Sequence, residues 1–163
     1  MAAFVGSAVL VTGTAQARGQ GGTLAPFTQS TEKLVASQLR EMLVNLGYEV
    51  KDLNTEAGKE KYSVTTVSAG LNIPVGFEIS PSGSYIWQTV NLGLASSSTK
   101  FEDLLKQNGI VQPTFFYITK SGALMAAQAI DNRAMTPAVL KRCHDKIVGD
   151  VGKTKEFWQA SAQ

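Results

Sequence analysis

The neighbouring residues Cys143 and His144 are the first place in this chain to look for chemistry, because a thiol and an imidazole can act as nucleophile and base. On a helix, however, consecutive side chains point about 100° apart and do not face each other. Cys143 falls on an apolar stripe of the expected last helix, and a thiol buried among apolar side chains is inert. We therefore expect core packing for Cys143 and a position at the edge of the helix for His144. That stripe consists of Leu140, Cys143, Ile147 and Val151.

The remaining polar groups do not form a recognisable catalytic or metal-binding set. The acid pair Glu56 and Glu60 falls in a polar turn, whereas Glu102 and Asp103 are explained by a helix start and its dipole. The serine run 96–98 reads as a linker and has no Gly-x-Ser-x-Gly elbow. A single histidine makes no metal site. The sequence thus predicts no catalytic residues, no metal and no cofactor.

Residues 9–19 (VLVTGTAQARG) imitate a strand followed by a glycine-rich dinucleotide loop. Such a loop needs glycines where the backbone approaches the pyrophosphate, followed by a helix. Here Ala17 stands at the position of the second glycine, and the residues that follow are a Gly/Gln spacer and Pro26. No Tyr-x-x-x-Lys pair occurs downstream. We therefore reject a dinucleotide site.

The first 17 residues contain no charged side chain, which sets them apart from the rest of the chain. An apolar run, Ala2–Val11, precedes Ala15-Gln16-Ala17, as in an export signal with its cleavage site, although no Lys or Arg comes before the run. The run is too short for a membrane-spanning helix, which needs about 20 apolar residues. We interpret 1–17 as a signal peptide and 18–29 as a flexible spacer, which predicts a periplasmic or secreted protein. A buried first strand is the alternative for the same residues.

Composition and charge exclude several classes of partner. The chain has 163 residues, 44% hydrophobic and 17% charged, which is typical of one globular domain. Fifteen Lys and Arg against thirteen Asp and Glu give a net charge of +2, too small to favour nucleic acid or an anionic membrane. One cysteine allows no internal disulfide, and a domain of this size does not need one.

Hydrophobic periodicity predicts three helices and about five to six strands. Apolar residues recur at helical spacing over Thr28–Leu46, and Gly47 stands where a helix commonly ends. Thr99-Lys100-Phe101-Glu102 fits a capping box, with Phe101, Leu104 and Leu105 on the buried side. The expected N-caps of the three helices are Ser30 or Thr31, Thr99, and Thr136 before Pro137. Strands are expected over 48–53, 62–71, 73–79, 85–92, 113–118 and 123–130.

The resulting order is α-β-β-β-β-α-β-β-α, with hairpins dominating and no βαβ alternation. This order predicts an α+β fold in which helices pack on an antiparallel sheet.

Three segments within this order resemble the bacterial sensory-transduction-regulator family. They are Ile73–Trp87 (IPVGFEISPSGSYIW), the run through Pro113–Phe116 with the hairpin after it, and Met135-Thr136-Pro137. The resemblance covers roughly residues 30–158 and implies a type III secretion chaperone-like fold for a single domain, 30–159. The family has no assigned catalytic residues, so the resemblance implies none here.

Aromatic residues are the candidate binding groups. Tyr85 and Trp87 share one face of a strand whose other face is also apolar, so helices could cover one face and a partner the other. Phe157 and Trp158 could extend this surface. Aromatic residues commonly anchor interfaces, although all four could instead complete the core.

Three functions remain open at this point. The favoured one is a non-catalytic, chaperone-like or regulatory module that is exported, forms a homodimer and binds a polypeptide partner. The alternative is a periplasmic small-molecule or envelope-stress sensor with a pocket between sheet and helices. An enzyme would need an unsuspected cluster of Asp, Glu, Tyr or Lys, which alanine replacement of Glu78 and Asp131 would test.

Overall fold

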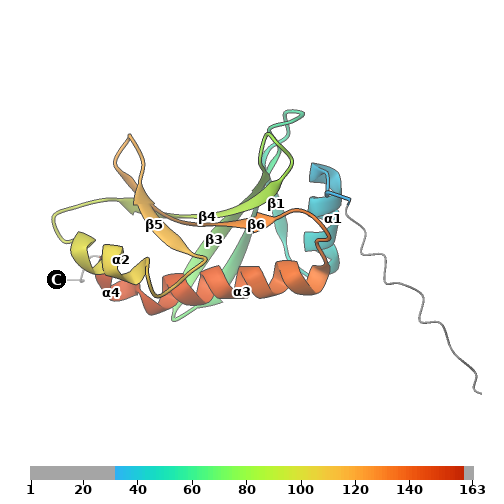
Figure 1. Ribbon diagram of the computed structural model, residues 1–163. Helices are drawn as coiled ribbons and strands as arrows, with labels where there is room; N and C mark the ends of the chain where they lie inside the picture. Colours follow the sequence, from blue (N-terminus) through green and yellow to red (C-terminus); the bar gives the residue numbers. More distant parts are fainter. Residues whose placement is uncertain (1–31, 160–163) are drawn as a thin grey trace, which may run out of the picture.

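One antiparallel sheet with helices against one of its faces organises the molecule (Figure 1). The computed structural model describes residues 32–159, so the predicted signal peptide and spacer lie outside the described residues. The predicted α+β fold and the order of its elements are confirmed, with one short C-terminal helix added. The elements are α1 (Ala36–Asn45), β1 (Val50–Asn54), β2 (Lys61–Ser68), β3 (Leu71–Ile79), β4 (Tyr85–Leu94), α2 (Phe101–Gln107), β5 (Phe115–Ile118), β6 (Ala123–Asp131), α3 (Pro137–Lys153) and α4 (Lys155–Trp158).

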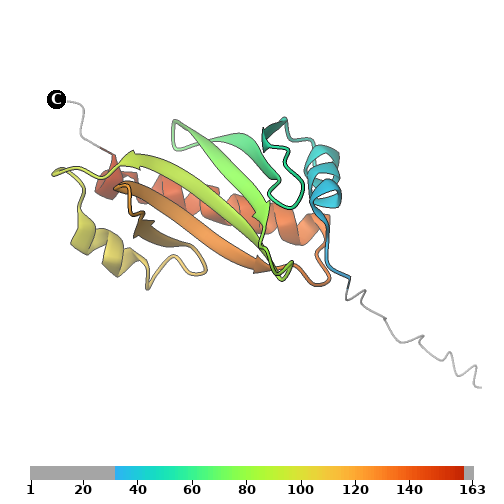
Figure 2. The same ribbon diagram turned by 90° about the horizontal axis from the view of Figure 1, so that it is seen from above.

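The six strands lie in the order β1-β2-β3-β4-β6-β5, and all neighbours are antiparallel. The first four strands form a meander, because each follows its neighbour through a short turn. The segment containing α2 then carries the chain past the position of β6, so that the β5–β6 hairpin places β5 at the edge. Seen from above, α3 runs behind the sheet, and no helix of the described residues crosses in front of it (Figure 2).

The core lies between the sheet and the helices α1 and α3. Alternation in β3 turns Ile73, Val75 and Phe77 toward the helices, and all three are buried. Leu39 and Leu43 of α1 contribute from the other side. Burial of these aliphatic and aromatic side chains is the main stabilising contribution to the fold.

Helix α1 begins at Ala36, so the predicted helix is wrong over residues 32–35, while its predicted start at Thr28 and the predicted caps Ser30 and Thr31 lie outside the described residues. The backbone of residues 33–34 is bonded to the end of β6 instead. Lys33 forms a β-bridge with Arg133, and the Leu34 N–H donates to the Asn132 side chain at 3.2 Å. Those contacts keep the segment out of the helix. The predicted end is confirmed, because Gly47 has a φ of +86°, a conformation that glycine adopts at low cost.

The predicted capping box of α2 is wrong. The Thr99 hydroxyl accepts a hydrogen bond from the Ser96 N–H at 3.0 Å and therefore caps a turn before the helix, whose N-cap is Lys100. Of the predicted buried side, only Leu104 is buried; Phe101 and Leu105 are 46% and 71% exposed. Helix α2 lies at the edge of the molecule against β5 and α4.

Helix α3 begins as predicted, with Pro137 in its first turn and the Thr136 hydroxyl accepting from the Val139 N–H at 3.2 Å. In its buried stripe, His144 takes the place that was predicted for Cys143. His144 is 1% exposed and points into the core, whereas Cys143 is half-buried. The spacing explains this, because 140, 144, 147 and 151 are the positions that follow one face of a helix of 3.6 residues per turn.

Candidate functional site

The face of the sheet opposite α3 carries a row of aromatic side chains. Pairing between β4, β6 and β5 puts Trp87 next to Ala129 and Phe115 next to Ala127, so these four residues share a face. The described helices lie against the other face or beside the sheet (Figures 1 and 2). We call this side the open face, and we call the side toward α3 the covered face.

Four aromatic residues form the row, which we call the aromatic row: Tyr85, Trp87, Phe115 and Tyr117. The Trp87 and Phe115 ring centroids lie 6.4 Å apart at 77°, an edge-to-face contact, and those of Phe115 and Tyr117 lie 5.8 Å apart. Tyr85 and Tyr117 are 48% and 38% exposed, and the two rings between them are half-buried. None of the four belongs to the core cluster, so the row is a surface feature built on the sheet.

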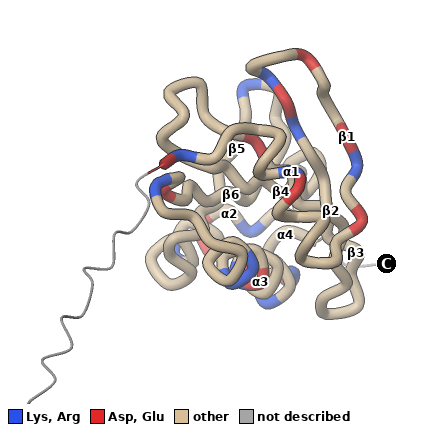
Figure 3. Tube along the Cα trace, turned by 90° about the vertical axis from the view of Figure 1, so that its right-hand side faces the viewer, with Lys and Arg blue, Asp and Glu red and all other residues tan. Residues whose placement is uncertain are grey.

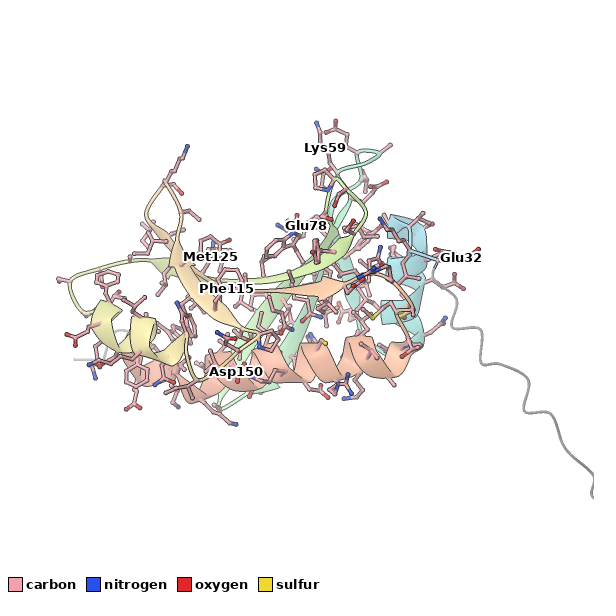
Figure 4. All side chains as sticks on the ribbon, viewed as in Figure 1. Glu32, Lys59, Glu78, Phe115, Met125 and Asp150 are labelled. Atoms are coloured by element: carbon pink, nitrogen blue, oxygen red, sulfur yellow. The ribbon has the colours of Figure 1, made fainter. Side chains whose placement is uncertain are left out.

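The charged groups of the open face lie around the row and neutralise each other. The Lys61 ammonium lies 3.2 Å from the Glu78 carboxylate, which Figure 4 places on the side of the sheet opposite α3. On the other side of β4, where Asp131 pairs with Tyr85, Arg133 donates to the Asp131 carboxylate from its side chain and its backbone, and these hydrogen bonds lower the pKa of Asp131 to about 2. Acidic and basic residues alternate along the described trace rather than gathering by sign (Figure 3). The open face is therefore apolar at its centre and electrically balanced at its rim.

Phe157 and Trp158 lie with the helices rather than on the open face. Both pack against the core cluster, and the Trp158 indole N–H donates to the Val151 carbonyl at 3.1 Å. The Phe157 carbonyl accepts from the Lys100 N–H at 2.8 Å, which ties α4 to the start of α2. The structure thus brings Tyr85 and Trp87 together but does not join them to the C-terminal pair.

His144 and Cys143 are in states that exclude the nucleophile–base pair considered first. The His144 ring lies between Tyr48 and Phe77, with centroid distances of 4.9 Å and 5.6 Å, and its Nε2 is 2.8 Å from the Thr66 hydroxyl. Burial lowers the pKa of His144 to about 4, so the ring is neutral near pH 7. Burial also raises the pKa of the Cys143 thiol, which keeps it protonated and unreactive.

A pair of buried glutamines on the covered face was missed by the sequence reasoning. The Gln128 amide nitrogen donates to the Gln88 side-chain oxygen and to the Cys143 carbonyl, both at 2.6 Å. Both glutamines are fully buried. The sequence could have indicated their burial, because each glutamine falls on the apolar side of a strand with alternating residues.

Two asparagines that join separate segments were also missed. The buried Asn132 side chain bonds both the N–H and the carbonyl of Leu34 and donates to the Gly83 carbonyl. The Asn108 side chain in turn bonds both backbone groups of Phe116, at 2.7 and 3.1 Å, and so covers part of the outer edge of β5. No periodic pattern marks such residues, because their partners are distant backbone groups.

Within residues 32–159, no group of three or more His, Cys, Asp or Glu side chains is placed to hold a metal ion. No helix in that range is long and apolar enough to cross a membrane.

No protein-family model and no curated protein matches this chain. Two solved structures resemble it. A chain in the structure of the HopA1–SchA chaperone–effector complex aligns with a TM-score of 0.51 and 14% identity, covering 76% of this chain and 92% of that one. A chain in the heterodimeric ExoU–SpcU complex from the type III secretion system of Pseudomonas aeruginosa aligns with a TM-score of 0.43 and 16% identity, covering 72% and 93%.

At these identities the likeness concerns the fold. The protein has a chaperone-like fold, and to this extent the implication of the resemblance is confirmed.

Proposed function

We propose that this protein is a non-catalytic, chaperone-like module that binds an apolar segment of a partner polypeptide on the open face of its sheet. The observation that carries the proposal is the aromatic row, which lies outside the core on a face that no described helix covers. Tyr and Trp are among the residue types that most often anchor protein interfaces, and here rigid strands hold them in a fixed arrangement.

The chemistry of the described residues supports a binding role over catalysis. The thiol is protonated, the histidine is buried and neutral, and the two acids considered for an enzyme each have a basic partner. The structure of the HopA1–SchA pair is that of a chaperone–effector complex, and this likeness in fold supports a polypeptide as the partner here.

The proposal includes a homodimer formed by a second apolar surface. Around α2 and β5, Phe101, Leu105, Ile110 and Ile118 are exposed, and three of them line a small groove. Exposed apolar groups gathered in this way favour burial against another surface. Sedimentation of the protein and of Leu105→Glu tests this, because the charged variant is expected to be monomeric and an unchanged dimer would exclude this surface.

We also propose that the chain belongs to the sensory-transduction-regulator family and is exported to the periplasm or secreted. The three resembling segments and the apolar, uncharged residues 1–17 support these statements. Mass spectrometry of the N-terminus in the native cells tests export: a start near Arg18 is expected, and an intact Met1 would remove this part of the proposal.

Capture of the tagged protein from its native cells tests the binding function. The wild type is expected to retain one stoichiometric protein companion, and Trp87→Ala is expected to lose it while unfolding cooperatively. Trp158→Phe is the matched control, because Trp158 packs among the helices, and it should retain the companion. A companion that survives Trp87→Ala would remove the open face as the binding site.

The alternative of a small-molecule or envelope-stress sensor is favoured by one cavity. A hollow of about 450 Å³ lies between the segment before α1, the β1–β2 loop and the β3–β4 turn. Its lining mixes apolar side chains with Lys33 and Glu60, which would suit a small ligand with a polar group. A saturable rise in melting temperature with a small molecule, abolished by Ala36→Trp in the wall, would favour this function over polypeptide binding.

A further inference from the structure

Helix α2 and the start of β5 meet at Asn108 and Gly109, in a region that we call the α2–β5 corner. These two residues form the one Asn-Gly step of the chain. Asparagine deamidates most readily before glycine, because no side chain hinders the backbone nitrogen that attacks it. We propose that Asn108 is a modification site, and that opening of the α2–β5 corner controls its spontaneous deamidation. This inference does not depend on the proposed function of the open face.

The closed corner protects the Asn108 amide. Its nitrogen donates to the Phe116 carbonyl at 3.1 Å, and its oxygen accepts from the Phe116 N–H at 2.7 Å, so both ends of the amide are held by β5. The Asn108 backbone is helical, with φ −55° and ψ −26°, and the Gly109 N–H donates to the Lys106 carbonyl at 3.2 Å. Deamidation requires the Gly109 nitrogen to approach the side-chain carbon of Asn108, which this conformation prevents. The reaction therefore needs the corner to open.

Little buried surface holds the corner closed. Helix α2 has seven residues, whereas isolated helices shorter than about 12–15 residues are marginal in water. Of these seven residues, all within the described range, only Leu104 is buried. The helix lies at the end of the molecule away from α1 (Figure 1). Segments with few buried contacts open at a lower free energy than the whole protein unfolds, so the corner can open while the sheet stays intact.

The reaction in the open corner consumes only water. Hydroxide removes the Gly109 N–H proton, and the nitrogen attacks the side-chain carbonyl carbon of Asn108. A new C–N bond forms, and the bond to the side-chain amide nitrogen breaks, so that this nitrogen leaves as ammonia after taking a proton from water. One water molecule then opens the resulting succinimide at either carbonyl and leaves an aspartate or an isoaspartate at position 108. The net change is hydrolysis of one amide, with no oxidant or reductant.

The product cannot restore the contacts that closed the corner. A carboxylate has no N–H to donate to the Phe116 carbonyl, and its negative charge lies next to that oxygen. An isoaspartate also adds a methylene group to the main chain, which displaces the residues that follow. Since ammonia is lost, the change is irreversible. The outer edge of β5 then loses the side chain that covers it and becomes available for pairing with another strand.

Mass spectrometry of peptides containing position 108 measures the reaction in the full-length protein, sampled over time in mildly alkaline buffer. Dilute samples keep a dimer formed at the neighbouring groove from shielding the corner. The same protein in concentrated urea gives the rate of the fully open chain. Gly109→Ala is the control for the chemistry, because its methyl group hinders the attacking nitrogen. The fold accepts this change, since Gly109 has no positive φ and the added Cβ would meet only the Lys106 carbonyl oxygen, at 3.5 Å.

Two leucine variants separate opening of the corner from unfolding of the whole protein. Leu104→Ala removes the buried side chain of α2, whereas Leu39→Ala removes an equally buried leucine from α1. Asn108 is expected to deamidate several-fold more slowly in the folded wild type than in urea, and several-fold faster in Leu104→Ala than in wild type. The rate in Leu39→Ala should equal that of wild type, and Gly109→Ala should be slowest in both buffer and urea.

Three outcomes would overturn the inference. Equal rates in the folded and the urea-unfolded wild type would show that the corner does not protect Asn108. No reaction in the folded wild type, after the unfolded chain has reacted completely, would show that the corner stays closed. Equal acceleration by Leu39→Ala and Leu104→Ala would show that the reaction passes through global unfolding.

Hydrogen exchange provides a second test that does not depend on the folding of a core variant. The Phe116 amide donates to the Asn108 side chain and therefore reports opening of the corner, whereas the Phe77 amide in the central strand β3 reports opening of the sheet. The Phe116 amide is expected to exchange several-fold faster than the Phe77 amide, and faster still in Asn108→Asp. Equal exchange of the two amides in wild type, or no change at Phe116 in Asn108→Asp, would overturn the inference.

Discussion

The two faces of the sheet are built from the same strands but differ in how completely their side chains are buried. On the covered face, Phe77 and Ile86 are fully buried against the helices, and the polar side chains among them form hydrogen bonds such as that from Gln128 to Gln88. On the open face, Trp87 and Phe115 pack edge to face but stay partly exposed. One residue step along a strand therefore moves a side chain from the core to the candidate binding surface.

This difference between the two faces means that the residues that stabilise the fold and the residues that bind a partner can be tested separately. Free energy of folding comes mainly from complete burial, which only the covered face provides. Recognition needs apolar groups that are held in place but not yet desolvated, which only the open face provides. Substitutions on the two faces should accordingly have different signatures, and the following predictions run from the largest expected effect to the smallest.

Phe77→Ala should reduce the free energy of unfolding by about 3–5 kcal/mol, because it leaves a cavity in the centre of the core. Phe115→Ala is the matched change on the open face and should cost about 1–2 kcal/mol, since that ring is only half-buried. Urea unfolding of both variants measures the difference. Similar losses for the two would mean that the open face contributes to the core as much as the covered face does.

Acidification should lower the free energy of unfolding, because the buried His144 side chain becomes protonated when the protein unfolds. Its pKa is about 4 in the folded protein and near 6.5 when unfolded, so the unfolded state binds the proton first as the pH falls. The contribution of neutral His144 to stability is therefore complete above pH 6.5 and is lost as the pH falls from 6.5 to 4, by roughly 3 kcal/mol.

The His144→Gln variant is the control for this effect, because it removes the titrating group and keeps a polar side chain near Thr66. The difference in unfolding free energy between wild type and variant should change with pH in this window. A constant difference would show that the buried ring does not control the acid response.

Gln128→Ala should cost about 1–3 kcal/mol, because it leaves the Gln88 side-chain oxygen buried without a donor and removes one hydrogen bond to the Cys143 carbonyl. Replacing both glutamines with leucine should cost less than the sum of the two single leucine variants, since both partners of the hydrogen bond are then removed together. Chemical denaturation of the four proteins gives the coupling energy. Strict additivity would show that the two amides are not coupled.

Sequence patterns predicted the elements well because alternation and helical spacing follow directly from burial. Strand β3 and the start of α3 were predicted almost to the residue, since Ile73 to Ile79 alternate strictly and Thr136-Pro137 is a local cap. The start of α1 was not, because Asn132, almost a hundred residues away, determines it. Local rules cannot detect a hydrogen bond between distant segments.

The candidate site was predicted only in part. Tyr85 and Trp87 could be placed on one face of a strand, but the sequence could not tell whether helices cover that face. The sequence did not predict that Phe115 and Tyr117 lie on the same face, because this depends on the pairing of β5 with β6. Phe157 and Trp158 are not part of this surface, because α4 packs them against the core. His144 was misplaced by one helical position, because a histidine was not expected where an apolar residue would pack.

Glu78→Gln, on the open face, should have the smallest effect on the free energy of unfolding. Its ion pair with Lys61 is partly solvated, so its removal should change the free energy of unfolding by less than about 1 kcal/mol. If the row binds an uncharged apolar segment, binding should survive this change, while Trp87→Ala, its neighbour in the register, should abolish it. Denaturation and a binding titration on the same samples measure both quantities. Loss of binding in Glu78→Gln with unchanged stability would show that the partner is recognised by charge, and the open face would then have to be understood as a polar site with an aromatic floor.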